Sequence, residues 1–165
     1  LSKAISKFKG VSGRMEVVST DPLVIVDFAH TPDGIEKVLN SLRHLNLIAV
    51  FGAGGDRDHD KRPKMAKAAT KFSDYIILTS DNPRTENPVK ILADIEKGLI
   101  AEKYPFDKYI IISDREKAIR YGMRLLQKGD SLLIAGKRHE TYQIIGNEKT
   151  HLDDREVVRK ILAGK

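Results

Sequence analysis

The sequence contains no cysteine in its 165 residues. This excludes disulfide bonds and thiolate metal sites, and it fits a reducing compartment. No apolar run approaches the roughly 20 residues that a helix needs to cross a bilayer, and the first residues are not those of a signal peptide. We therefore expect no membrane partner. The chain also lacks an initiator methionine, so we expect it to be a piece of a longer protein.

The sequence also has no block of arginine and lysine interleaved with aromatic residues, so nucleic-acid binding is not expected. The net charge of +6 either steers an anionic ligand such as a nucleotide or belongs to a lysine-rich surface. Internal repeats and low-complexity stretches are absent. The 41% hydrophobic and 32% charged residues are typical of a soluble globular protein, and the length fits one domain.

Short runs of branched apolar residues mark the strands. They lack polar alternation, so each predicts a strand buried on both faces. The runs are at residues 23–26, 47–51, 75–78, 109–112 and 132–135. Segments with helical spacing of apolar residues separate them, and Thr31, Asn87 and Asp114 are expected N-caps. Alternation of strand and helix predicts a parallel sheet with helices on both faces.

After the fifth run, residues 141–145 and 149–152 flank Gly146-Asn147 and predict a hairpin at one edge. A last helix begins after Asp153 or Asp154. The predicted fold class is a single doubly wound, Rossmann-like α/β domain with a mostly parallel sheet and a C-terminal edge hairpin.

Polar and glycine-rich segments follow four of the five predicted strands. Because ligands of such sheets bind at the carboxyl ends of the strands, these segments are expected to converge on one site. They are Asp27-Phe28-Ala29-His30, Gly52-Ala53-Gly54-Gly55-Asp56-Arg57, Asp81-Asn82-Pro83-Arg84, and Gly136-Lys137-Arg138-His139-Glu140.

Each segment also has an ordinary structural interpretation. Asp27 and His30 could cap the following helix, Gly52 to Gly55 could form a tight turn, and residues 81–84 could be any Asn-Pro turn. Residues 137–140 could be a solvated charge run. The glycine-rich loop is not a Walker loop, and Arg57 replaces the third glycine of a dinucleotide fingerprint. His139 and His151 lack zinc-ligand spacing, so no metal site is expected.

Seven segments, taken together and in order, resemble the Mur ligases, and the resemblance covers nearly the whole chain from about residue 10. The segments are Gly13-Arg14-Met15-Glu16, Asp27-Phe28-Ala29-His30-Thr31-Pro32, Gly54-Gly55-Asp56-Arg57-Asp58, Lys61-Arg62-Pro63, Asp81-Asn82-Pro83-Arg84, Ala135-Gly136-Lys137 with His139-Glu140-Thr141, and Asp153-Asp154-Arg155-Glu156.

The resemblance implies that residues 13–165 are a Mur ligase C-terminal domain and residues 1–12 a linker from a central ATPase domain that is missing here. ATP and Mg would be bound mainly by that missing domain. The implied protein is cytoplasmic, and the isolated chain is expected to be inactive, with no catalytic residue of its own.

In the family, Asp-Asn-Pro-Arg is the signature of enzymes that take meso-diaminopimelate. The implied reaction uses ATP to convert the D-glutamate side-chain carboxylate of a UDP-muramyl dipeptide to an acyl phosphate. The amine of diaminopimelate then attacks, giving an amide, ADP and phosphate. The expected partners are therefore meso-diaminopimelate, the UDP-muramyl dipeptide and ATP.

The resemblance also implies roles for single residues. Arg84 would bind the spectator carboxylate of diaminopimelate, Asn82 would add a neutral hydrogen bond, and Pro83 would stiffen the turn begun by Asp81. For the spectator ammonium the implied acceptors are Glu140 and the Gly136 carbonyl, and Arg57 would bind a carboxylate near the reacting end. Finally, Arg14, Asp27 and His30 would face the nucleotide.

Two positions after the fifth predicted strand have no role that the resemblance assigns directly. Lys137 is expected to contact either a phosphate or only solvent. Arg138 stands where the family usually has glycine, and a positive φ there would strain the backbone.

Two other functions stay open at this point. One is a related ligase domain for another muramyl peptide, for folylpolyglutamate or for cyanophycin, against which the Asp81-Asn82-Pro83-Arg84 segment argues. The other is a non-catalytic nucleotide-binding module, against which the incomplete glycine pattern argues.

Overall fold

The structure, a computed structural model, describes residues 14–137 and 140–164. The expected linker at residues 1–12 and the family departure at Arg138 lie outside the described residues, as does His139. No helix within the described ranges is long and apolar enough to span a bilayer.

A six-stranded sheet forms the centre of the domain, in the order β1-β2-β6-β3-β4-β5. All neighbouring pairs are parallel except β1 and β2, which are antiparallel. The strands are β1 (Glu16–Thr20), β2 (Leu23–Asp27), β3 (Asn46–Phe51), β4 (Tyr75–Leu78), β5 (Tyr109–Ile111) and β6 (Asp130–Ala135). The five predicted strands are thus confirmed. The edge strand β1 was missed, because its half-exposed residues form no continuous apolar run.

Four of the helices begin at a side chain that accepts a hydrogen bond from the first turn; α3 does not. Thr31, Asn87, Asp114 and Asp153 each cap the helix that follows, as their sequence context predicts. The helices are α2 (Pro32–Ser41), α3 (Lys61–Thr70), α4 (Pro88–Ala101), α5 (Arg115–Leu125) and α6 (Asp154–Leu162), with a short 3-10 turn η1 (Phe106–Lys108) before β5.

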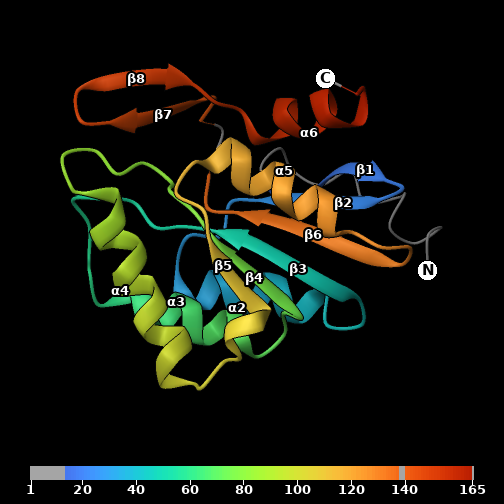
Figure 1. Ribbon diagram of the computed structural model, residues 1–165, viewed down its shortest axis with the longest axis horizontal. Helices are drawn as coiled ribbons and strands as arrows, with labels where there is room; N and C mark the ends of the chain where they lie inside the picture. The colour runs from blue at the N-terminus through green and yellow to red at the C-terminus, as the bar shows by residue number, and fades with distance from the viewer. Residues whose placement is uncertain (1–13, 138–139, 165) are drawn as a thin grey trace.

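The helices cover both faces of the sheet (Figure 1). On one face α2, α3 and α4 pack against alternate strand residues such as Ile25, Phe51 and Leu78. On the other, α5 and α6 pack against the intervening residues, such as Val24 and Ile134. Because side chains alternate across a strand, each apolar run supplies both cores. The doubly wound α/β fold is confirmed.

The predicted C-terminal hairpin is confirmed as β7 (Tyr142–Ile145) and β8 (Glu148–His151). It forms a two-stranded sheet of its own rather than extending the main sheet. Figure 1 shows it on the side toward which the parallel strands point. A single bridge links Ile145 to Arg84 in the loop after β4, so the hairpin lies beside the predicted site.

A fully buried ion pair lies beneath the carboxyl ends of β4 and β6. Arg115 donates to both oxygens of Asp154, at 2.9 and 2.7 Å, and Nη2 of Arg115 also donates to the Ala135 carbonyl at 3.1 Å. The pair joins α5, α6 and β6 at one point. Removing one partner would leave a buried charge without compensation.

We therefore expect Arg115→Ala to lower the free energy of unfolding by about 3–5 kcal/mol. Arg124→Ala is the matched control, because Arg124 is an exposed arginine of the same helix; it should change stability by about 0.5 kcal/mol or less. Urea unfolding of both variants measures the difference. Equal effects would contradict a structural role for the buried pair.

Candidate functional site

A cavity of about 230 Å³ opens where the loops after β2, β3, β4 and β6 meet. Six of the seven predicted amino-acid-binding residues line it: Arg57, Asp81, Asn82, Arg84, Gly136 and Glu140. The seventh, Pro83, is buried beside the cavity and is not part of its wall. Segments as far apart in sequence as those of Phe28 and Glu140 therefore converge as the sheet topology predicts.

The glycine-rich loop after β3 packs directly on the turn of residues 81–84. The Gly55 amide donates to the Asn82 carbonyl at 2.8 Å. A Cβ at Gly55 would lie 1.8 Å from the Pro83 carbonyl oxygen, and one at Gly52 would lie 1.9 Å from that of Thr79. Close backbone contact therefore requires glycine at both positions, and the loop serves to support the turn.

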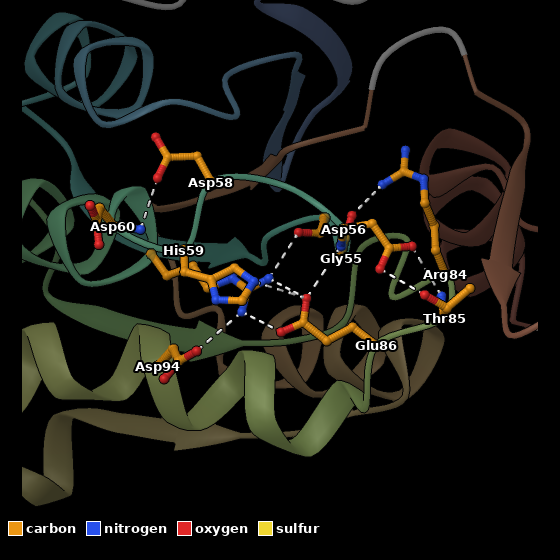
Figure 2. A network of polar contacts seen from close by, with 11 residues as sticks. Gly55, Asp56, Asp58, His59, Asp60, Arg84, Thr85, Glu86 and Asp94 are labelled. Carbon is orange, nitrogen blue, oxygen red and sulfur yellow. Dashed lines mark hydrogen bonds and ion pairs between the residues drawn. The ribbon is translucent and has the colours of Figure 1, made fainter.

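Arg84 is held in an uncommon backbone conformation, with φ of 55°. Its amide donates to the Ile144 carbonyl at 3.1 Å, and its carbonyl accepts from the Gly146 amide at 2.6 Å. Nη1 donates to the Gly55 carbonyl at 2.9 Å (Figure 2). Its Nε and Nη2 atoms have no partner within the described ranges, so this edge of the guanidinium can bind a carboxylate with two hydrogen bonds.

Asn82 joins the turn to the far wall of the cavity. Its Nδ2 donates to Glu140 Oε2 at 2.8 Å, and its Oδ1 accepts from the Ile144 amide at 2.8 Å. The side chain is 3% exposed. Asn82 therefore orients Glu140 and the hairpin, and its second amide hydrogen has no partner among the residues described, so it can bind a ligand.

Asp81 presents a buried carboxyl group to the same cavity. Burial raises the pKa of Asp81, although the nearby charges of Arg115 and Lys137 lower it. Its Oδ1 atom finds no hydrogen-bond partner among the residues described.

Arg57 adds a second unpaired cation. The side chain is exposed and lines the cavity, with no ion pair in the described part of the chain. Of the other charged groups in the walls, Arg62 pairs with Glu86 and Asp94, and Lys61 with Asp58. The guanidinium groups of Arg57 and Arg84 and the carboxyl groups of Asp81 and Glu140 form no ion pair within the described ranges. This charge pattern suits a small zwitterionic ligand with more than one carboxylate.

Lys137 does not behave as expected. It is 1% exposed, and Nζ donates to the carbonyls of Tyr142 at 2.7 Å and Leu152 at 3.1 Å. Burial lowers the pKa of Lys137 to about 8. Both expected contacts, phosphate and solvent, are wrong, because the two ends of the hairpin close over this side chain.

A second cavity, of about 460 Å³, adjoins the first and shares Phe28 and His30 with it. The three residues predicted to face a nucleotide, Arg14, Asp27 and His30, line it together. Asp27 accepts backbone hydrogen bonds from Met15 and Ala29, both at 2.7 Å. It therefore positions the segment that carries Arg14, while Arg14 and His30 themselves are exposed.

Over residues 13–138 the chain matches the family described as Mur ligase, glutamate ligase domain. The chain belongs to the Mur ligase family. It is 52% identical over its full length to the UDP-N-acetylmuramoyl-L-alanyl-D-glutamate–2,6-diaminopimelate ligase of Helicobacter hepaticus, and covers 35% of that protein. The ligase of the same name from Caldanaerobacter subterraneus is 51% identical over 93% of this chain and 32% of its own length. The chain thus spans about a third of these relatives.

Solved structures agree with this family. A structure titled as a UDP-N-acetylmuramoyl-L-alanyl-D-glutamate–2,6-diaminopimelate ligase superposes with a TM-score of 0.84 at 44% identity, over 96% of this chain and 33% of the other. A folylpolyglutamate synthase of Mycobacterium tuberculosis has a TM-score of 0.62 at 21% identity, over 78% of this chain and 30% of its own. The second likeness shows a shared fold.

Arg62 is a buried residue of the Mur ligase domain to which no role was assigned from sequence. It donates to both Glu86 oxygens at 2.6 Å, to Asp94 at 3.1 Å and to the Gly54 carbonyl at 3.4 Å. Glu86 in turn accepts from the Asp56 amide at 3.2 Å (Figure 2). The network joins α3 and α4 to the glycine-rich loop.

The helical spacing already contained a signal for this role. Arg62 precedes Met65 and Ala69 by three and seven residues, so it continues their buried stripe. Glu86 and Asp94 also approach His59 closely enough for a cation, with all candidate ligand atoms within 4.8 Å of one another. Arg62 already binds both carboxylates, however, and supplies the charge that they need.

This network predicts an acid-dependent part of the stability. The hydrogen bonds from Arg62 lower the pKa of Glu86 from 4.5 to about 2. A depressed carboxyl pKa stabilises the fold fully above pH 4.5, and this contribution is lost as the pH falls toward 2. In Glu86→Gln the free energy of unfolding should therefore fall less over this window than in the wild type.

Urea unfolding at several pH values between 2 and 6 measures this dependence. Glu102→Gln is the control, because Glu102 forms a surface ion pair with Lys67, and such pairs contribute little. The free energy of unfolding of Glu102→Gln should depend on pH as that of the wild type does. If the free energy of unfolding of Glu86→Gln also keeps the wild-type pH dependence, the Arg62 network does not stabilise the loop.

Proposed function

We propose that this chain is the amino-acid-binding domain of a cytoplasmic, ATP-dependent amide ligase of peptidoglycan synthesis. The ligase adds meso-diaminopimelate to UDP-MurNAc-L-Ala-D-Glu. The observation that carries the proposal is the unpaired guanidinium edge of Arg84 in a cavity that also holds Asp81 and Glu140. The names of two ligases about half identical to the chain support the same reaction.

Diaminopimelate differs from lysine by one carboxylate, so the site must recognise that group. Arg84 binds the spectator carboxylate in a bidentate manner, and the second amide hydrogen of Asn82 adds a neutral bond. Glu140 and the carbonyl of Gly136 accept from the spectator ammonium, with Asp81 as a further acceptor. Buried Pro83 keeps the turn rigid, and exposed Arg57 binds the carboxylate near the reacting amine.

The domain contributes binding and orientation to the ligation. ATP supplies the phosphoryl group that activates the D-glutamate carboxylate, and a domain outside this chain holds ATP and Mg. The second cavity fits the nucleotide side of that complex, because Arg14 offers an exposed cation for phosphate and Phe28 and His30 offer paired rings 4.6 Å apart. Asp27 fixes the backbone that carries Arg14.

The full-length protein that contains this chain should release phosphate only when ATP, UDP-muramyl dipeptide and diaminopimelate are all present. The isolated chain should release none above the blank, because its sequence contains no Gly-Lys-Ser/Thr phosphate loop. A coupled assay for inorganic phosphate measures both. Sustained release by the isolated chain, or full-length activity with lysine but not diaminopimelate, would contradict the proposal.

Arg84 should set the preference for diaminopimelate. Loss of one partner of a buried charge pair costs about 2–5 kcal/mol, and a partly wet cavity favours the lower half of that range. Arg84→Ala in the full-length ligase should therefore lower kcat/KM for diaminopimelate at least about thirty-fold. The low activity with lysine should change much less, so the preference between the two amino acids narrows.

Arg84→Lys tests the geometry of the contact, since it retains the charge but not the two-pronged donor, and should recover only part of the loss. A competition assay with both amino acids compares the wild type with the two variants. If Arg84→Ala lowers both activities equally, Arg84 supports the loop and does not read the substrate.

A further inference from the structure

Gln143 is a buried amide in the otherwise open hairpin. It is 8% exposed, whereas the residues from Ile145 to Thr150 are all exposed. Its Nε2 donates to the Asp81 carbonyl at 2.6 Å and to the Ser80 carbonyl at 3.4 Å. Both carbonyls belong to the segment that leads from β4 into the 81–84 turn.

The backbone of the hairpin forms hydrogen bonds with the same turn. The Ile144 amide donates to Asn82 Oδ1 at 2.8 Å, and the Ile144 carbonyl accepts from the Arg84 amide at 3.1 Å. The Gly146 amide then donates to the Arg84 carbonyl at 2.6 Å. Gln143, Ile144 and Gly146 thus contact the turn at three of its residues.

These hydrogen bonds matter because Arg84 has a positive φ, a backbone conformation that residues with a side chain disfavour. Such a conformation persists only where the surroundings hold it. The Asp81 carbonyl, at the start of the turn, is directed inward, and a buried acceptor is costly when it loses its donor. Without the Gln143 amide, the start of the turn would have to rotate toward another donor.

We propose that Gln143 is a positioning residue that fixes the 81–84 turn and thereby sets the selection of diaminopimelate over lysine. Gln143 does not line the cavity, so it acts through the Asp81 carbonyl on the placement of Asn82 and Arg84. This inference rests on the proposed function, because it assumes that Arg84 reads the distinguishing carboxylate.

The first test is Gln143→Met in the full-length ligase. Methionine keeps the length and burial of the side chain but cannot donate. The KM for diaminopimelate should rise about ten-fold or more, while the KM values for ATP and the muramyl dipeptide stay unchanged. The preference for diaminopimelate over lysine should narrow. A purely structural role would change all three KM values or none.

The second test is Gln143→Glu, which makes the donor depend on pH. When ionised, this side chain faces two carbonyl oxygens without a hydrogen; when protonated, it donates one bond. The ratio of its KM for diaminopimelate to that of the wild type should therefore fall between pH 8.5 and pH 6. Asp81, Glu140, Lys137, Arg115 and Asp154 lie around the turn in both proteins, so the wild-type KM at each pH is the baseline for the comparison.

Asn147→Asp is the matched control, because it makes the same amide-to-acid change at an exposed position of the same hairpin. It should leave the KM unchanged at both pH values. A thermal melt establishes that each variant is folded. An unchanged KM in folded Gln143→Met, or a KM ratio for Gln143→Glu that does not fall at low pH, overturns the inference. Failure of the wild type to use diaminopimelate refutes the proposed function instead.

Discussion

Three cationic side chains are buried behind the loops of the cavity, and the site depends on the partners that these cations bind. Arg62 binds Glu86 and Asp94 beside the glycine-rich loop, and Arg115 binds Asp154 beneath the strand ends. Lys137 binds two carbonyls where the hairpin begins and ends. A buried charge without partners is very costly, so each cation fixes the segments that supply its partners. The loops are thereby held in place before any ligand arrives.

This arrangement leaves other charged groups for a ligand. Arg57 and one edge of Arg84 remain unpaired within the described ranges, and Asp81 keeps an unsatisfied oxygen. Because Arg62 and Arg115 already pair with Glu86, Asp94 and Asp154, these carboxylates do not need Arg57 or the unpaired edge of Arg84. The hairpin adds a second support, since it forms hydrogen bonds with the 81–84 turn, as the glycine-rich loop does. Preorganisation of this kind reduces the ordering cost of binding.

Local patterns predicted the fold well and the supporting network poorly. The apolar runs, the caps at Thr31 and Asn87, and the Gly146-Asn147 hairpin are short-range signals, and the structure has all of them. The convergence of four loops followed from the direction of parallel strands. Strand β1 was missed, because it is stabilised by its pairing with β2 and its own residues carry no strand pattern. The role of Lys137 was wrong, since the residues that cover it lie five and fifteen positions away.

By itself, the sequence determined five of the six strands of the main sheet, the helices between them, the family and the residues that gather at one sheet edge. Periodicity, capping and motif order are local properties, so the sequence alone contains them. Only the tertiary structure decided which charges are available. The chain has arginine at positions 57, 62, 84 and 115, but Arg62 and Arg115 are buried in ion pairs, whereas Arg57 and Arg84 line the cavity without an ion pair among the described residues. Which state each adopts depends on partners distant in sequence, such as Asp154 for Arg115. Burial and the long-range pairing that it demands therefore separate the arginines that hold the site from those that face a ligand.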